Sequence, residues 1–76
     1  MKATVMRIGK RIRELRKERN MTQLDLSVKS GMEENAVQRL ETARTYPTFK
    51  TLFRIAKGLD IELKELFIFS NRNLTK

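Results

Sequence analysis

Residues 22–41 read TQLDLSVKSGMEENAVQRLE, and this stretch decides the fold. Thr22 can cap a helix, because a threonine hydroxyl accepts a hydrogen bond from a free amide of the first turn. Gly31 ends that helix and can supply the positive φ of a tight turn. Acidic residues then open a second helix, where they suit the positive end of the helix dipole. We predict helices over residues 22–29 and 33–41.

The small and apolar residues of this stretch fit two helices that cross at a short turn. Ser27 is small at the crossing point, and Val37 and Leu40 fill the angle between the helices. Two helices joined by a short turn that contains a glycine form the DNA-binding helix-turn-helix arrangement. Leu24 and Val28 lie four residues apart on the first of these helices, and we expect them to pack on a helix predicted over residues 48–58. The alternative is an exposed patch for a partner.

Helical periodicity continues on both sides of this stretch. A helix over residues 5–19 is predicted by apolar residues at spacings of three and four, namely Val5, Ile8, Ile12 and Leu15. Asn20 can end it, since asparagine tolerates the left-handed conformation. After Pro47, helices are predicted over residues 48–58 and 62–69 by the apolar residues Leu52, Ile55, Ala56, Leu59, Leu63, Leu66 and Phe67.

The predicted fold class is all-α, a single domain of five short helices over residues 1–69. No stretch alternates apolar and polar residues in the manner of a strand. Residues 70–76 are expected to form a polar C-terminal tail. A chain of this size buries roughly 60% of its unfolded surface, so the core must be small.

The composition excludes several classes of function. The chain has 76 residues, no cysteine and no histidine. Disulfides, thiolate or imidazole metal sites and Ser-His or Cys-His catalysis are therefore excluded. Gly9 and Gly31 are isolated and form no phosphate-binding loop, so we expect no enzyme, no metal and no cofactor. No apolar run approaches the roughly 20 residues of a membrane span, and no secretory signal is present. We expect a cytoplasmic protein.

Basic side chains outnumber acidic ones by seventeen to nine, which gives a net charge of +8. The excess favours a polyanionic partner, nucleic acid first. Residues 1–20 and 42–76 carry this excess, whereas residues 21–41 hold two basic and four acidic side chains. The predicted helix-turn-helix is thus flanked by basic segments and is not itself basic. This distribution fits DNA recognition, because phosphates attract charge whereas bases are read by hydrogen bonds.

A set of short motifs runs through most of the chain: IGKRIRELR from residue 8, MTQ from residue 21, RLE from residue 39 and IAK from residue 55. With Ser30-Gly31, Pro47-Thr48 and Leu66-Phe67, they resemble the Cro/CI-type (XRE) helix-turn-helix domain of bacterial and phage repressors. The resemblance implies five helices and a sequence-specific regulator of transcription, a repressor that binds operator DNA as a dimer. It also implies a bacterial, phage or plasmid origin.

The resemblance implies two kinds of contact with double-stranded DNA. The helix over residues 33–41 lies in the major groove, and four of its residues match base-facing positions: Glu34, Asn35, Gln38 and Arg39. Contacts to the sugar–phosphate backbone fall to Arg11, Thr22, Gln23, Arg44, Thr45, Tyr46 and Lys50. A solvated polar surface is the alternative for these side chains. Glu33 and Glu34 repel phosphates, so they either select a cytosine amino group or weaken binding.

Other positions bear on structure. The resemblance pairs Arg16 with Glu41, a partly buried ion pair that orients the reading helix. Relatives often carry glycine where this chain has Ala43 and Asp60. Because alanine disfavours the left-handed conformation, we predict that the loop at Ala43 differs from that of relatives and avoids a positive φ.

A dimer is expected because one helix-turn-helix reads only half of an operator. The last two helices hold more apolar side chains than one small core needs: Phe53, Leu63, Phe67, Ile68 and Phe69. They either form the dimer interface or close the bottom of the core. An alternative function is a protein-interaction module, an antitoxin or antirepressor-like protein with a toxin or similar partner. The acidic start of the 33–41 helix and the pair Leu24 and Val28 favour that alternative.

Overall fold

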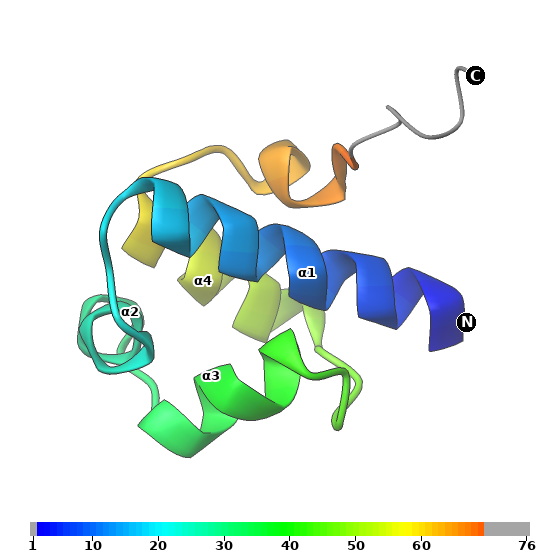
Figure 1. Cartoon of the computed structure of the whole chain (residues 1–76), viewed down its shortest axis with the longest axis horizontal. Coiled ribbons are helices and arrows are strands. Elements are labelled where there is room, and N and C mark those ends of the chain that lie inside the picture. Colours follow the sequence, from blue (N-terminus) through cyan, green and yellow to red (C-terminus); the bar gives the residue numbers. More distant parts are fainter. Residues whose placement is uncertain (1, 70–76) are drawn as a thin grey trace.

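The computed structural model describes residues 2–69 and holds an all-helical domain (Figure 1). Its elements are α1 (Lys2–Glu18), α2 (Gln23–Ser30), α3 (Glu34–Glu41), α4 (Phe49–Leu59) and the 3-10 helix η1 (Leu63–Phe67). α1 runs the length of the domain, with α2 and α3 on one side of it and η1 on the other. The predicted all-α class is confirmed. The predicted tail over residues 70–76 lies outside the described residues.

Three of the five predicted helices match the structure to within one residue at each end, and the other two differ more. α1 begins at Lys2, not near residue 5, because its first turn packs beside the end of α3. There Val5 is buried and the Lys2 Nζ lies 3.5 Å from the carbonyl oxygen of Ala43. The fifth is no α-helix but a short 3-10 turn, closed by a 3.0 Å bond from the Glu65 amide to the Glu62 carbonyl. The tighter turn lets a five-residue segment bury Leu66 in the core.

Every element contributes to one apolar core. Its least exposed side chains are Ile12 of α1, Leu26 of α2, Val37 of α3, Ile55 and Leu59 of α4, and Leu66 of η1. α2 and α4 approach each other at Gly58, where an added Cβ would overlap the Ser30 hydroxyl oxygen. Small residues on both helices, Ser30 and Gly58, therefore permit the close crossing. Ser27, which was expected at the crossing of α2 with α3, is also buried.

All four α-helices of the described chain end in the same hydrogen-bonded turn. One or two residues after each helix ends, the chain has a residue with a left-handed φ: Asn20, Gly31, Ala43 and Asp60. The next amide bonds back to a carbonyl five residues earlier: Met21 to Arg16, Met32 to Ser27, Arg44 to Arg39 and Ile61 to Ala56, at 2.8 to 3.1 Å. This is the Schellman motif, which satisfies carbonyls that a helix end leaves free.

The prediction that Ala43 avoids the left-handed conformation was wrong, since its φ is 60°. The turn is held by the 2.8 Å bond from the Arg44 amide to Arg39 and by burial of Ala43 itself. These contacts outweigh a steric cost of about 1–2 kcal/mol for alanine. At the ends of α1, α2 and α4, the left-handed residue is followed by a methionine or isoleucine that packs on the core. At the end of α3, the left-handed Ala43 is followed by the exposed Arg44.

The prediction that Leu24 and Val28 pack on α4 was also wrong. Their exposed fractions are 53% and 72%. α2 turns Leu26, Ser27 and Ser30 inward, and this leaves Leu24 and Val28 on the opposite side of an eight-residue helix. We call this exposed pair the α2 patch.

Candidate nucleic-acid interface

α3 has one buried side and one exposed side. Val37, Leu40 and Glu41 are buried. All four residues matched to base-facing positions are exposed: Glu34, Asn35, Gln38 and Arg39. Within residues 2–69, no side-chain hydrogen bond or ion pair occupies any of these four. α3 therefore presents an uncommitted polar surface along its length.

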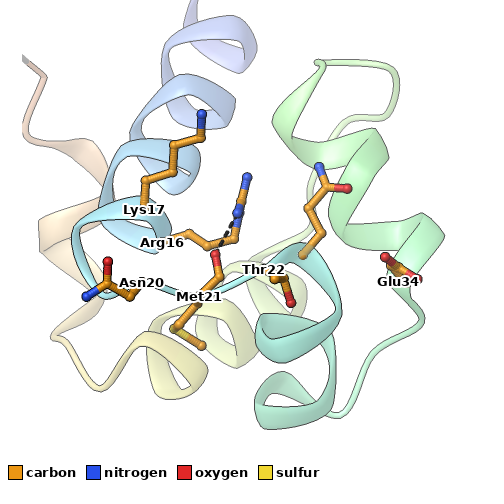
Figure 2. A pocket seen from close by; sticks show the side chains of 7 residues that line it. Arg16, Lys17, Asn20, Met21, Thr22 and Glu34 are labelled. Carbon is orange, nitrogen blue, oxygen red and sulfur yellow. Dashed lines mark hydrogen bonds between the residues drawn. The ribbon is translucent and has the colours of Figure 1, made fainter.

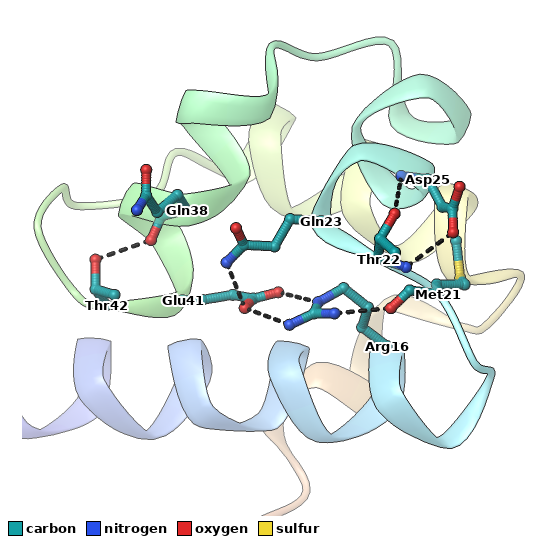
Figure 3. A network of polar contacts seen from close by, with 8 residues as sticks. All are labelled: Arg16, Met21, Thr22, Gln23, Asp25, Gln38, Glu41 and Thr42. Carbon is teal, nitrogen blue, oxygen red and sulfur yellow. Dashed lines mark hydrogen bonds and ion pairs between the residues drawn. The ribbon is translucent and has the colours of Figure 1, made fainter.

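The C-terminal end of α3 is anchored to α1 and α2 (Figure 3). Arg16 donates from Nε to Glu41 Oε2 at 2.6 Å and from Nη2 to Oε1 at 3.0 Å, so the expected ion pair is present and bidentate. The third guanidinium nitrogen donates to the Met21 carbonyl at 2.7 Å. The two side chains are only 9% and 2% exposed. Because both charges are buried, removing either partner would leave the other charge uncompensated.

Gln23 joins this buried pair. Its Nε2 donates to Glu41 Oε1 at 3.1 Å, which links the first residue of α2 to the last of α3 (Figure 3). Gln23 was predicted only as a phosphate contact. The link could not be predicted from spacing, because the two residues are 18 apart and meet only after the helices cross. One amide hydrogen of Gln23 is left for another acceptor.

α1 contacts the end of α3 through three residues spaced seven apart. Lys2 reaches Ala43, Gly9 lies against the backbone of α3, and Arg16 binds Glu41. An added Cβ on Gly9 would overlap the carbonyl oxygens of α3's last two residues. Spacings of seven fall on one side of a helix. This row on α1 therefore sets the position of α3.

The N-terminus of α2 borders a hollow on the same side of the domain as α3. Figure 2 shows its lining residues: Arg16, Lys17, Asn20, Met21, Thr22, Gln23 and Glu34. A helix N-terminus beside cationic side chains is suited to an anion. Lys17 was not singled out from the sequence, although it directly follows Arg16 at the end of α1.

Thr22 caps α2 in a complete capping box. Its hydroxyl accepts from the Asp25 amide at 2.9 Å, and Asp25 Oδ2 accepts from the Thr22 amide at 2.8 Å. The backbone bond from Thr22 and then its side-chain bond hold the pKa of Asp25 below its ordinary value. Thr22 thus serves the fold, and its predicted role at a phosphate remains a prediction.

α3 begins without such a cap. Glu33 is the N-cap residue, with an extended backbone, and its carboxylate bonds to no amide of α3. It lines a groove with Thr51 and Arg54 of α4, whereas Glu34 lines the hollow beside α2. The two adjacent carboxylates therefore face different surroundings.

The loop between α3 and α4 lies beyond the other end of α3 (Figure 1). Arg44 and Tyr46 are exposed and Thr45 is half-buried. Lys50 is exposed in the first turn of α4, which Thr48 caps through a 3.1 Å bond from the Thr51 amide. The structure thus places these four predicted backbone contacts beyond the C-terminal end of α3. Gln23 is bound to Glu41 at that same end, and together with Thr22 it borders the hollow that Glu34 also lines.

Arg11 does not lie on this surface. Its Nε donates to the Glu65 carbonyl at 2.9 Å, and its guanidinium lies 3.6 Å from the Glu65 carboxylate and 3.9 Å from Glu14. It ties α1 to η1, on the side of the domain away from α3 (Figure 1). Its partner is 54 residues distant in the sequence, so only the tertiary fold reveals that Arg11 is occupied.

The residues expected at a dimer interface fall into two groups. Phe53, Phe67 and Ile68 are between 44% and 51% exposed. Leu63 and Phe69 instead pack against the core. Phe49 was not predicted, yet it is 71% exposed and stacks on Phe53, with ring centroids 6.5 Å apart. The spacing of four residues between the two phenylalanines was the available signal.

Among the described residues, no three acidic side chains gather to hold a metal ion. No helix of residues 2–69 is long and apolar enough to cross a membrane.

The short helices α2 and α3 meet at a turn that contains Gly31. The buried side of α3 is fixed by α1 and α2, and its polar side is exposed. This geometry defines a helix-turn-helix DNA-binding domain. The helix-turn-helix family model HTH_3 matches residues 12–66. The chain belongs to this family, of the XRE type, and is a DNA-binding regulator of transcription, not an enzyme. The resemblance drawn from the sequence is confirmed.

Relatives and solved structures agree with this assignment. An uncharacterized HTH-type transcriptional regulator of Archaeoglobus fulgidus is 33% identical over 64 residues, which cover 84% of this chain and 91% of the relative. The immunity repressor protein of Bacillus phage phi105 is 33% identical over 61 residues, 80% of this chain but only 42% of the repressor. The restriction-modification controller protein C.AhdI of Aeromonas hydrophila superposes with a TM-score of 0.83 at 32% identity, over 86% of this chain and 98% of the controller.

Proposed function

We propose that this regulator binds operator DNA sequence-specifically, with α3 in the major groove and Glu34, Asn35, Gln38 and Arg39 at base edges. The observation that supports the proposal is the division of α3. Its polar side is exposed and uncommitted, while Glu41 behind it is bound by Arg16 and Gln23. A helix held from behind can present base-reading side chains in one fixed orientation.

The proposed backbone contacts form two groups. Gln23, the α2 N-terminus and Lys17 border the hollow beside α2, which can hold a phosphate. Arg44, Thr45, Tyr46 and Lys50 follow α3 and can bind the sugar–phosphate backbone of the second DNA strand. Because Arg11 is bound to Glu65, Lys17 replaces it as the α1 contact in this proposal.

We propose that the regulator acts as a dimer. Exposed apolar area is left on α4 by Phe49 and Phe53, and at the end of η1 by Phe67 and the following Ile68. A second copy would cover that area and supply the reading helix for the other half-site. In light scattering at micromolar concentration, the wild-type chain should have twice the mass of a monomer. The Phe53→Ser variant should have the mass of a monomer. A wild-type monomer at high micromolar concentration would argue against the dimer.

We propose repression as the regulatory outcome. An immunity repressor and a restriction-modification controller are among the similar proteins. A reporter gene behind the selected operator should lose expression when the chain is supplied. A rise in expression would mean activation instead.

The experiment for DNA binding is selection from a random duplex pool, followed by titration against salt. Six to ten phosphate contacts per dimer weaken binding roughly 10³- to 10⁵-fold between about 50 and 200 mM salt. Arg39→Ala should relax preference at one base position, whereas Arg44→Ala should weaken all sequences alike and reduce the salt slope. Lys64→Ala on η1 is the matched control and should change neither. Failure to enrich any sequence would defeat the proposal.

A second candidate function is binding of a protein partner, such as a toxin or antirepressor. The α2 patch favours it, because Leu24 and Val28 are exposed beside the reading helix. Val28→Ser should leave DNA binding intact and abolish such a complex.

A further inference from the structure

Glu34 lies where a carboxylate is hard to reconcile with DNA binding. It stands in the first turn of α3 and lines the hollow beside the α2 N-terminus, where the proposed phosphate would sit (Figure 2). Within residues 2–69 it forms no ion pair and caps no helix. Its charge suits the N-terminal end of the α3 dipole, but no basic side chain of the described residues pairs with it. A carboxylate near phosphates opposes binding unless the DNA supplies a compensating donor.

The major groove supplies such donors at only two kinds of base. The cytosine N4 and adenine N6 amino groups are its only hydrogen-bond donors, and the other polar edges are acceptors. An ionised glutamate only accepts hydrogen bonds. Glu34 is thus compatible with a base edge only where an amino group faces it.

We infer that the regulator binds its operator tightly only when an unmethylated amino group of cytosine or adenine faces Glu34. This inference rests on the proposed function. It adds a regulatory input: operator DNA methylated at that nitrogen is bound about tenfold more weakly than unmodified operator, or weaker still. Methylation on the exocyclic nitrogen would then act as a signal to the regulator.

The chemistry of a paired amino group gives the reason. One of its two hydrogens bonds to the complementary base, and the other points into the groove. In a base-paired duplex the methyl group takes the groove-facing place. Glu34 then loses its donor, meets an apolar group and keeps its repulsion of the nearby phosphates. Loss of one good base contact weakens binding roughly tenfold or more.

Glu33 provides a matched control. It carries the same charge one residue earlier but lines the groove with Thr51 and Arg54 on the α4 side. Its removal changes the net charge as removal of Glu34 does. Glu33→Ala should therefore bind all DNA somewhat more tightly and keep the sensitivity to methylation.

The test uses the full chain and the operator selected from unmodified random DNA. Synthetic duplexes carry N4-methylcytosine or N6-methyladenine at each cytosine or adenine of one half-site, and 5-methylcytosine serves as the control that keeps the amino hydrogen. Fluorescence anisotropy measures each Kd. At one position, amino methylation should weaken wild-type binding about tenfold or more, and 5-methylcytosine should have a much smaller effect. Glu34→Ala should bind non-specific DNA more tightly and lose the methylation effect at that position only.

The possible failures are distinguishable. If no sequence is enriched, the proposed function fails and this inference fails with it. If an operator is enriched but amino methylation changes no Kd by more than about twofold, the inference alone is overturned. An equal loss with 5-methylcytosine, or an undiminished loss in Glu34→Ala, would also overturn it.

Discussion

The two ends of α3 are built for different purposes. At the C-terminal end, Glu41 is buried and accepts three hydrogen bonds from Arg16 and Gln23, while Gly9 admits α1 to backbone contact. At the N-terminal end, Glu33 caps nothing and Glu34 is exposed. The difference teaches that one eight-residue helix separates the residues that fix it from the residues that read. Substitution of the buried anchoring residues should therefore change stability, and substitution of the exposed residues of α3 should change recognition.

The largest expected effect comes from removing the charge partner at the anchored end. Arg16→Met should lower the free energy of unfolding by about 3–5 kcal/mol, because Glu41 stays buried without its counter-charge. For a small domain this is a large part of the total stability. Urea denaturation measures the change.

The double variant Arg16→Met with Glu41→Leu is the control for that prediction. It removes both charges and should recover most of the loss. If the single variant stays within about 1 kcal/mol of the wild type, the anchor does not stabilise the domain as we infer.

The next effect tests the close approach of α1 to the same end of α3. Gly9→Ala should destabilise the domain by about 1–3 kcal/mol, because its Cβ would overlap two backbone oxygens. Alanine favours helices by up to about 1 kcal/mol over glycine, so any net loss reports the contact. The exposed neighbour Lys10→Ala should change stability by less than about 0.5 kcal/mol in the same denaturant titration. A stabilised Gly9→Ala protein would contradict the contact.

A third pair of variants exchanges the caps of α2 and α3. Thr22→Ala should cost about 1 kcal/mol, because it removes the hydroxyl that accepts from Asp25. Glu33→Ser should add about 0.5–1 kcal/mol by giving α3 the cap that it lacks. The melting temperature should shift by roughly 4–8 °C per kcal/mol, downward for Thr22→Ala and upward for Glu33→Ser. A drop in Tm for Glu33→Ser would mean that Glu33 stabilises α3 in another way.

The smallest effect is expected where α3 meets its loop. Ala43→Gly should raise stability by no more than about 0.5 kcal/mol, since relief of the left-handed strain is offset by the greater freedom of unfolded glycine. Gly31→Ala is the reverse control and should cost about 1 kcal/mol. A Cβ added at Gly31 would have no atom within 4 Å apart from those of its chain neighbours. The variant therefore tests only the strain of placing alanine at a φ of 67°. Equal melting temperatures for wild type and Gly31→Ala would refute the strain argument.

Local signals in the sequence predicted much of the fold. Thr22, Thr48 and Gly31 act through bonds to residues a few positions away, so short motifs were enough to place them. The apolar spacing of α1 and α4 likewise predicted their buried sides.

What escaped prediction depends on residues distant in the sequence. Ala43 adopts its φ because the tertiary contacts of the α3 end hold it, against its own preference. Leu24 and Val28 could not be oriented, since an eight-residue helix with apolar residues on two sides leaves its buried side ambiguous. For the candidate site, the exposed side of α3 was predictable from its period. The engagement of Arg11 with Glu65 was not, because 54 residues separate them.

Tyr46 has a practical consequence for following this molecule. It is the single tyrosine of a chain without tryptophan, and it is 58% exposed in the loop after α3. Tyrosine fluorescence from the native protein therefore arises from one ring at one place. Quenching of that emission would report contact at the loop in real time, without an attached dye and without any substitution.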